Sequence, residues 1–145
     1  MKTIFTIREI ETEKEMLSLF PLLTQLNSQL KKADYKIMLK DMLLHNYRMA
    51  GVFQGKECVG LSGFWIGTKI YSGKYVELDN VVIDKDYRSQ GVGKLLCDWV
   101  INEAKKLGCK TAMLDAYAEN FSGHKFYLRE GFIIRGFHFT KKINT

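Results

Sequence analysis

The chain has 145 residues, of which 46% are hydrophobic and 26% are charged, a balance typical of one globular domain. The formal net charge of +6 favours anionic partners such as phosphates, nucleic acid or a membrane face, without choosing among them. Cys58, Cys97 and Cys109 show no zinc-binding spacing, so we expect a reduced cytoplasmic protein with no metal ion. No segment approaches the length of a membrane span or resembles a signal-peptide core.

The first half of the chain predicts one strand, two helices and a meander. We expect the first strand at residues 3–10, followed by a helix whose start has the capping-box pair Thr12 and Glu15. A second helix is predicted from Asp34. Strand patterns then follow at residues 48–53, 58–66 and 75–83, joined by turns at 54–56 and 71–74. These three strands should form an antiparallel meander.

The second half predicts a crossover unit. Apolar residues recur at a period near 3.6 over residues 91–107 and indicate a helix that ends at Gly108. A strand at 110–116 follows, so the strands on either side of this helix should be parallel. A helix at 120–130 and a strand at 132–143 complete the order β-α-α-β-β-β-α-β-α-β. The predicted fold class is α/β (α+β), a mixed sheet with helices on its faces, in one domain spanning residues 1–145.

The strongest chemical signal lies where the strand at Val81 to Ile83 runs into the helix at 91–107. Gly91 and Gly93 occupy the turn, and glycines let a backbone approach a ligand closely. The first turn of a helix has unpaired N–H donors and the positive end of the helix dipole. We therefore expect this turn to bind a pyrophosphate, with added positive charge from Arg88 and Lys94.

Other glycine loops fit this segment less well. A P-loop requires Ser or Thr after its lysine, but Leu95 follows Lys94. A dinucleotide fingerprint requires a third glycine where this chain has Leu96. If only the glycines are considered, one alternative to a pyrophosphate site remains: the turn has no ligand and simply starts the helix.

Two motifs resemble those of the GNAT superfamily of N-acetyltransferases. Arg88-x-x-Gly91-x-Gly93 after the sequence Val-Val-Ile-Asp resembles the acetyl-CoA signature of that family. Residues 120–132, with Asn120 seven positions before Tyr127 and a Phe-Tyr-x-x-x-Gly-Phe ending, resemble its later motif. The chain departs at Lys85, where a proline is common, and at Gly123, where an alanine is common. The resemblance implies a GNAT-like acyl-CoA N-acyltransferase fold and is weakest over residues 12–48.

The resemblance also implies acetyl-CoA as co-substrate and assigns its contacts. The strand backbone should hold the pantetheine arm, the turn should bind the pyrophosphate, and Asn120 should touch the pantetheine end. The expected cofactor-binding residues are Val81, Val82, Ile83, Arg88, Ser89, Gln90, Gly91, Val92, Gly93, Lys94 and Asn120.

Catalysis by direct attack of a primary amine in a ternary complex needs a base, an acid and an oxyanion donor. The motif places Tyr127 near the thioester sulfur, and an unperturbed tyrosine with a pKa of about 10 can donate a proton at neutral pH. Glu77, Asp79 and Asp115 are candidate bases. We expect Glu77 to act through water and Asp79 to bind the amine, since both project from one face of their strand. The N–H of Val82 is the expected oxyanion donor.

The acceptor is expected to be an amine of a small molecule or of a protein. The ending from His124 to Lys141 resembles the aminoalkylphosphonate N-acetyltransferase branch. Aromatic side chains that could line the acceptor site are Tyr35, Phe64, Trp65, Tyr71 and Tyr75. We expect no nucleic-acid or membrane partner, and a homodimer is one assembly that the fold allows. A non-catalytic acyl-CoA-binding sensor is the alternative, followed by a nucleic-acid-binding domain.

Overall fold

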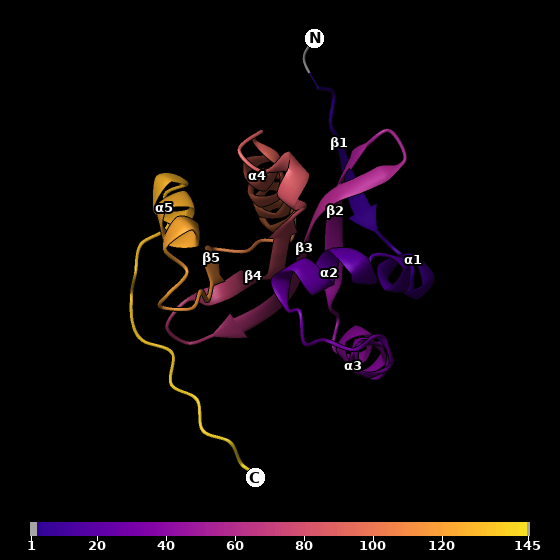
Figure 1. The fold of residues 1–145 in the computed structure, drawn as a ribbon. Coiled ribbons are helices and arrows are strands. Elements are labelled where there is room, and N and C mark those ends of the chain that lie inside the picture. The colour runs from indigo at the N-terminus through magenta and orange to yellow at the C-terminus, as the bar shows by residue number, and fades with distance from the viewer. Residues whose placement is uncertain (1–2, 145) are drawn as a thin grey trace. The chain divides into compact units, whose positions relative to one another are not determined.

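The computed structural model describes residues 3–144, in two compact units, Met1–Met113 and Leu114–Thr145. Each unit is described by itself. In chain order (Figure 1) the elements are β1 (Thr6–Ile10), α1 (Glu13–Ser18), α2 (Phe20–Leu26), α3 (Lys32–Leu44), β2 (Arg48–Gln54), β3 (Glu57–Lys69), β4 (Gly73–Ile83), a short 3₁₀ helix (Lys85–Tyr87), α4 (Val92–Lys106), β5 (Thr111–Leu114) and α5 (Phe121–Arg129).

The strands form one sheet in the order β1-β2-β3-β4-β5. β1 to β4 pair antiparallel with their neighbours, so the predicted meander is confirmed. The turn between β2 and β3 uses Gly55 at a φ of 60°, a left-handed conformation that glycine adopts without steric cost. β5 lies next to β4 and is joined to it through α4, the type of crossover that connects parallel strands. The predicted α/β class with a mixed sheet is confirmed.

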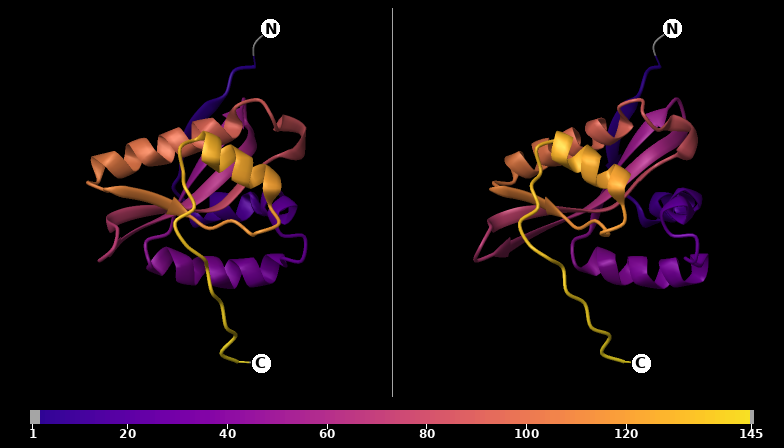
Figure 2. Two further views of the ribbon diagram at one scale, coloured as in Figure 1. Left: turned by 90° about the vertical axis from the view of Figure 1, so that its left-hand side faces the viewer. Right: turned by 60° about the vertical axis from the view of Figure 1, so that its left-hand side comes forward.

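In the first unit, helices cover both faces of the sheet (Figure 2). On one face Val92, Leu96 and Val100 of α4 are buried, and Gly60 of β3 allows the helix to approach closely. A Cβ atom on Gly60 would lie 2.7 Å from Cγ1 of Val92. The opposite face packs against α1, α2 and α3. Its buried cluster includes Met49, Leu61, Val82, Leu22, Leu23 and Leu39.

The N-terminal helical region differs from the expectation. Thr12 is the N-cap of α1, with Oγ1 accepting a hydrogen bond of 3.1 Å from the N–H of Glu15, so the predicted start is confirmed. The single helix expected after it is wrong, since α1 ends at Ser18 and α2 begins at Phe20. Pro21 is the physical reason, because its missing N–H and fixed φ suit only the first turn of a helix.

The expected last strand at residues 132–143 is also wrong. Within residues 3–144, no strand follows α5. The backbone N–H of Phe132 donates to the carbonyl of Tyr127 at 3.0 Å, but residues 133–144 form no backbone hydrogen bond with the other described residues. The period-two pattern is present, but a strand exists only when a neighbouring strand takes up its hydrogen bonds.

Candidate active site

A β-bulge interrupts β4 beside the two carboxylates that the sequence singled out. Asp79 pairs with Gly63 and Val82 pairs with Leu61, so β4 has one residue more than β3 between these pairs. Asn80 lies in this bulge with a φ of 57°, a left-handed conformation that Asn tolerates better than most residues. Bulges re-aim side chains and leave one residue outside the ladder. The sequence analysis did not predict this bulge. The presence of Asn80 inside an otherwise apolar strand could have indicated it.

Hydrogen bonds fix the side chains around this bulge. Nε1 of Trp65 donates to Oδ2 of Asp79 at 2.9 Å, and Nδ2 of Asn80 donates to the hydroxyl of Tyr47 at 3.2 Å. The Tyr47 and Trp65 rings lie 4.9 Å apart between centroids. A Cβ atom on Gly63 would collide with the Tyr47 hydroxyl, so glycine makes room for this ring. Sequence reasoning missed Tyr47 and left the role of Trp65 unassigned.

Burial keeps the two tyrosines of this region protonated. Tyr47 is buried, and desolvation raises the pKa of its hydroxyl well above the ordinary value, although the hydrogen bond from Asn80 lowers it. Burial likewise raises the pKa of Tyr35, on α3, to about 12. Both hydroxyl groups therefore stay neutral well above physiological pH.

Glu77 and Asp79 lie two residues apart on β4, and both are half-buried. The buried residues Val76 and Leu78 alternate with them, so the two carboxylates share the opposite face of the strand. Glu77 pairs in register with Trp65, whose indole binds Asp79. This part of β4 can therefore present two acidic groups to a cationic amine.

The segment after β4 is anchored by side-chain hydrogen bonds. Oδ1 of Asp84 accepts from the N–H of Asp86 at 2.9 Å, and Oδ2 accepts from Nε2 of Gln25 at 3.3 Å. Oε1 of Gln25, on α2, accepts from the N–H of Lys85 at 2.9 Å. These bonds hold the start of the 3₁₀ helix against α2, so the following turn begins from a defined position.

The turn at residues 88–91 contains two residues with left-handed backbone. Ser89 has a φ of 63° and Gly91 a φ of 84°, both left-handed. Gly91 is the N-cap of α4 and provides no capping side chain.

The main-chain donors of this turn have no acceptor within residues 3–144. Among the described residues, no hydrogen bond uses the main-chain N–H groups of Ser89, Gln90, Gly91, Val92 or Gly93. The first turn of α4 has no acidic residue. Lys94 adds positive charge and lies 3.4 Å from Asp98 through its Nζ. Clustered donors at the positive end of a 15-residue helix fit the pyrophosphate of a coenzyme.

The second unit holds the other predicted residues on α5. Oδ1 of Asn120 accepts from the N–H of Gly123 at 3.1 Å, so this side chain caps the helix. A Cβ atom on Gly123 would collide with the Asn120 amide, which explains glycine at this position. The half-buried ring of Tyr127 packs edge-on against Phe126 and Phe132, with centroids 5.2 and 5.8 Å away.

Asp115, the third candidate base, also lies in the second unit. Its Oδ2 is 3.4 Å from Nδ1 of His138, and both side chains are more than half exposed. The structure therefore brings Glu77 and Asp79 together within the first unit, and it places Asp115 and Tyr127 in the second.

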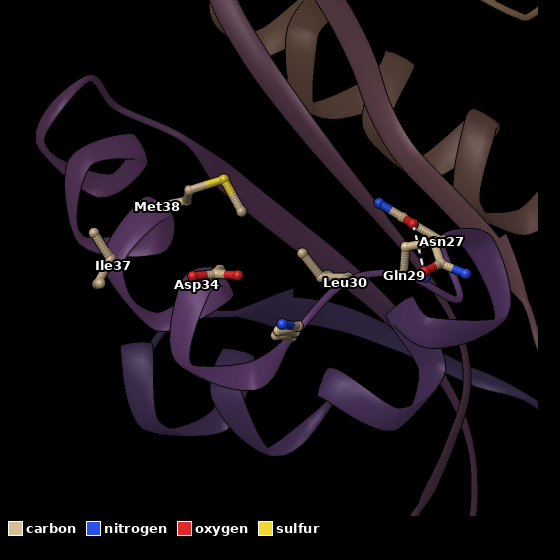
Figure 3. A pocket seen from close by; sticks show the side chains of 7 residues that line it. Asn27, Gln29, Leu30, Asp34, Ile37 and Met38 are labelled. Carbon is tan, nitrogen blue, oxygen red and sulfur yellow. Dashed lines mark hydrogen bonds between the residues drawn. The ribbon is translucent and has the colours of Figure 1, made fainter.

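An open hollow lies between the end of α2 and α3 (Figure 3). Its volume is about 460 Å³, and the N–H of Gln29 donates to Oδ1 of Asn27 at its rim. Its lining contains one carboxylate, that of Asp34, and one ammonium group, that of Lys31, among amide and apolar side chains. The lining residues are Asn27, Gln29, Leu30, Lys31, Asp34, Ile37 and Met38.

Comparisons with known proteins agree with this geometry. The sequence model described as the acetyltransferase (GNAT) family matches residues 11–132. An uncharacterised N-acetyltransferase of Bacillus subtilis is 22% identical over 94% of this chain and 98% of its own. The aminoalkylphosphonate N-acetyltransferase of Salmonella typhimurium is 28% identical over 82% of this chain and 76% of its own.

Solved structures share the fold. The aminoglycoside N-acetyltransferase AAC(6')-Iy, solved in complex with CoA, superposes with a TM-score of 0.84 at 20% identity, covering 97% of this chain and 96% of that one. Glucosamine-6-phosphate N-acetyltransferase of Arabidopsis thaliana gives a TM-score of 0.75 at 19% identity, over 97% and 99% of the two chains.

The chain belongs to the acetyltransferase (GNAT) family and is an N-acetyltransferase, an enzyme that transfers acetyl groups from acetyl-CoA to amines. The family match runs across both compact units. Within residues 3–144, no helix has the length and apolar character needed to cross a membrane.

Proposed function

We propose that a primary amine attacks acetyl-CoA directly in a ternary complex, with both substrates bound at the β4–α4 junction. The observation that carries this proposal is the row of unpaired N–H groups from Ser89 to Gly93 at the start of α4. These donors and the α4 dipole bind the pyrophosphate of coenzyme A. Arg88, which is exposed in the turn, and Lys94 add positive charge.

The end of β4 binds the pantetheine arm through its backbone. Val82 and Ile83 follow the bulge and pair in register with Leu61 and Gly60 of β3, whereas Val81 lies within the bulge. Peptide groups that a bulge leaves outside the ladder are available to a ligand that extends the strand. The N–H of Val82 is the proposed donor to the carbonyl oxygen as negative charge develops on it.

The carboxylates of β4 prepare the amine. Asp79, held by the indole of Trp65, binds the ammonium form, and Glu77 takes up its proton through a water molecule. Once neutral, the nitrogen bonds to the acetyl carbon and the carbon–sulfur bond breaks, and the second proton that the nitrogen then loses replaces the one given to the departing thiolate. Tyr127 donates a proton to the departing thiolate, and Asn120 contacts the cofactor near its pantetheine end. Asp115 remains the alternative base.

The acceptor class is an amine of a small molecule or of a protein. The half-buried carboxylates of Glu77 and Asp79 on β4 support a cationic acceptor. The relative from Salmonella typhimurium acts on aminoalkylphosphonates by its name, so an aminophosphonate belongs in any test panel. No metal ion has a part in this mechanism.

Coenzyme A binding tests the central claim through a matched pair of glycines. Gly91 and Gly108 lie at opposite ends of α4, both have positive φ, and a Cβ atom would meet no neighbour at either position. Each change to alanine should therefore cost about 1–2 kcal/mol of backbone strain. By titration calorimetry, we expect Gly91→Ala to weaken coenzyme A binding at least tenfold and Gly108→Ala to change it less than twofold. Equal effects, or no binding heat with the parent chain, would contradict the proposal.

The catalytic roles need separate variants. We expect Glu77→Gln to lower kcat about 100-fold, within the range for general base catalysis. Tyr127→Phe should lower kcat while leaving the KM for acetyl-CoA within twofold. If Glu77→Gln, Asp79→Asn and Asp115→Asn each lower the rate less than tenfold, the carboxylate-base mechanism is wrong.

A thiol-release assay with acetyl-CoA over a panel of amines identifies the acceptor. The panel should contain aminophosphonates, aminoglycosides, polyamines and peptides with free N-terminal or lysine amines. Release with one class identifies the acceptor class. Coenzyme A binding without release for any amine would favour the alternative function, a non-catalytic acyl-CoA sensor.

A further inference from the structure

We propose that a groove between α1 and α3 binds an acidic polypeptide segment in an extended conformation. This groove, here called the lysine groove, has a volume of about 530 Å³. All of its residues belong to the first compact unit, so the proposal does not involve the second unit, and it does not rest on the catalytic mechanism. The lining residues are Glu13, Lys14, Leu17, Ser18, Lys32, Lys36 and Lys40.

Two packed helices gather the lysines of this groove. α1 packs against α3 within the first unit (Figure 1). Lys32, Lys36 and Lys40 follow one another at intervals of four residues on α3, and all three are exposed, so they form one row beside the groove. Lys14 of α1 adds a fourth ammonium group. The lining therefore has four positive charges against the single carboxylate of Glu13, which is half-buried with Oε1 shielded from solvent.

The chain itself does not neutralise these ammonium groups. Among the described residues, the four lysines of the groove form no ion pair and no side-chain hydrogen bond. On α4, by contrast, Lys94 lies 3.4 Å from Asp98 through its Nζ. Like charges four residues apart on a helix destabilise it, so the row on α3 is unfavourable when it is free. A ligand with negative charges at matching positions would remove this repulsion, and the groove is therefore complementary to an anionic partner.

The spacing of the row matches an extended peptide. An α-helix rises 1.5 Å per residue, so lysines four residues apart are separated by about 6 Å along α3, and the row spans about 12 Å. In an extended peptide, side chains of alternate residues lie on one face and are separated by about 6.6–6.8 Å. Carboxylates at alternate positions of an extended segment can therefore each lie near one lysine of the row.

The chemistry of the lining favours a polypeptide over a nucleic acid or a membrane. The lining contains no arginine and no aromatic residue, the side chains that bind phosphates with two parallel hydrogen bonds and stack on bases. Leu17 is its one apolar side chain and is half-buried, whereas helices that lie on a membrane present several large apolar side chains to the lipid. Carboxylates on an extended peptide need neither of these features.

NMR titration of the ¹⁵N-labelled full chain tests the site directly. The probe is a twelve-residue peptide of alternating Glu and Ser, blocked at both ends so that it has six carboxylates and no amine. At low salt we expect a dissociation constant on the order of 100 µM, because exposed charge pairs are individually weak. Amide shifts should concentrate at residues 13–18 and 32–40. No shifts in these two ranges, or larger shifts at residues 89–93, would overturn the proposal.

A matched pair of variants separates the groove from net charge. Lys32→Gln/Lys36→Gln/Lys40→Gln should raise the dissociation constant of the peptide at least tenfold. Glutamine has a helix propensity close to that of lysine, so this variant should keep the parent circular dichroism spectrum. It should also bind coenzyme A within twofold of the parent, which distinguishes the groove from the turn at residues 88–94. The control removes three exposed lysines of other segments and should change peptide binding less than threefold: Lys56→Gln/Lys105→Gln/Lys110→Gln. Equal weakening by both variants would overturn the proposal.

Three further probes test the chemical class of the partner. A peptide with Gln in place of every Glu should not bind. A heptanucleotide of DNA, which has six phosphate charges, should bind the groove at least threefold more weakly than the acidic peptide. Vesicles that contain phosphatidylserine should sediment the parent and the groove variant equally. Binding of the heptanucleotide as tightly as the peptide, or sedimentation that the groove variant abolishes, would assign the groove to nucleic acid or to a membrane and overturn the proposal.

Discussion

β4 and residues 132–143, here called the C-terminal segment, both have alternating sequences but differ in structure. β4 lies between β3 and β5, and its Val76 and Leu78 are buried. The C-terminal segment contains Phe137 and Phe139, which are as apolar as any residue of β4, yet both are almost fully exposed. The difference shows that alternation specifies a preference for extended backbone, whereas the neighbouring strands specify whether a strand forms.

Two phenylalanines provide the largest test of this comparison. Phe64 on β3 is fully buried and packs edge-on against Trp99 of α4 at 6.2 Å, whereas Phe137 is 87% exposed. We expect Phe64→Ala to lower the free energy of unfolding by about 3–5 kcal/mol. Phe137→Ala should change it by less than about 0.5 kcal/mol. Urea unfolding measures both changes, and similar losses of unfolding free energy in the two variants would contradict this comparison.

Two glycines provide the next largest effect. A Cβ atom on Gly63 of β3 would collide with the Tyr47 hydroxyl, whereas one on Gly136 would meet nothing within 4 Å. Gly63→Ala should cost about 1–3 kcal/mol through overpacking beside the bulge. Gly136→Ala should be neutral when both variants are compared with the parent by thermal unfolding. A Gly63→Ala protein as stable as the parent would mean that Tyr47 can leave its position freely.

The dependence of stability on alkaline pH tests the burial of Tyr35 on α3. The pKa of Tyr35 is raised by burial to about 12 in the folded chain, from about 10 when unfolded. The folded state therefore holds the proton more tightly. The contribution of this tighter proton binding to the free energy of unfolding is fully present below pH 10. Roughly 2 kcal/mol of it is lost as the pH rises from 10 to 12. In Tyr35→Phe, unfolding free energies should fall less steeply across this window. The exposed Tyr117→Phe is the control, and an unchanged slope in Tyr35→Phe would contradict the prediction.

The bulge of β4 gives the smallest expected effect. Asn80 adopts a φ of 57° and donates to Tyr47, features that distinguish this strand from a regular one. Asn80→Ala should cost about 1 kcal/mol, because alanine tolerates the left-handed region poorly and the hydrogen bond is lost. Asn80→Gly should recover the backbone part of the loss. If alanine and glycine are equally harmful, backbone conformation is not the cause.

The sequence determined much of this protein by local rules. The meander, the cap at Thr12, the amphipathic helix α4 and the glycine turn at Gly91 all follow from propensity, periodicity and helix-end chemistry. The motifs around Gly91 and Tyr127 also identified the family, because the chemistry of a diphosphate site depends on a short contiguous run of backbone.

Only the tertiary structure decided the features that need distant partners. It placed Tyr47 and Trp65 around Asp79, although the Tyr47 hydroxyl and Asn80 are 33 positions apart in sequence. It also placed the bulge at Asn80, which exists only relative to the register of β3, and left the C-terminal segment unpaired. Hydrogen-bond ladders and side-chain packing join residues that are far apart in the chain. A short stretch of sequence therefore does not determine these features.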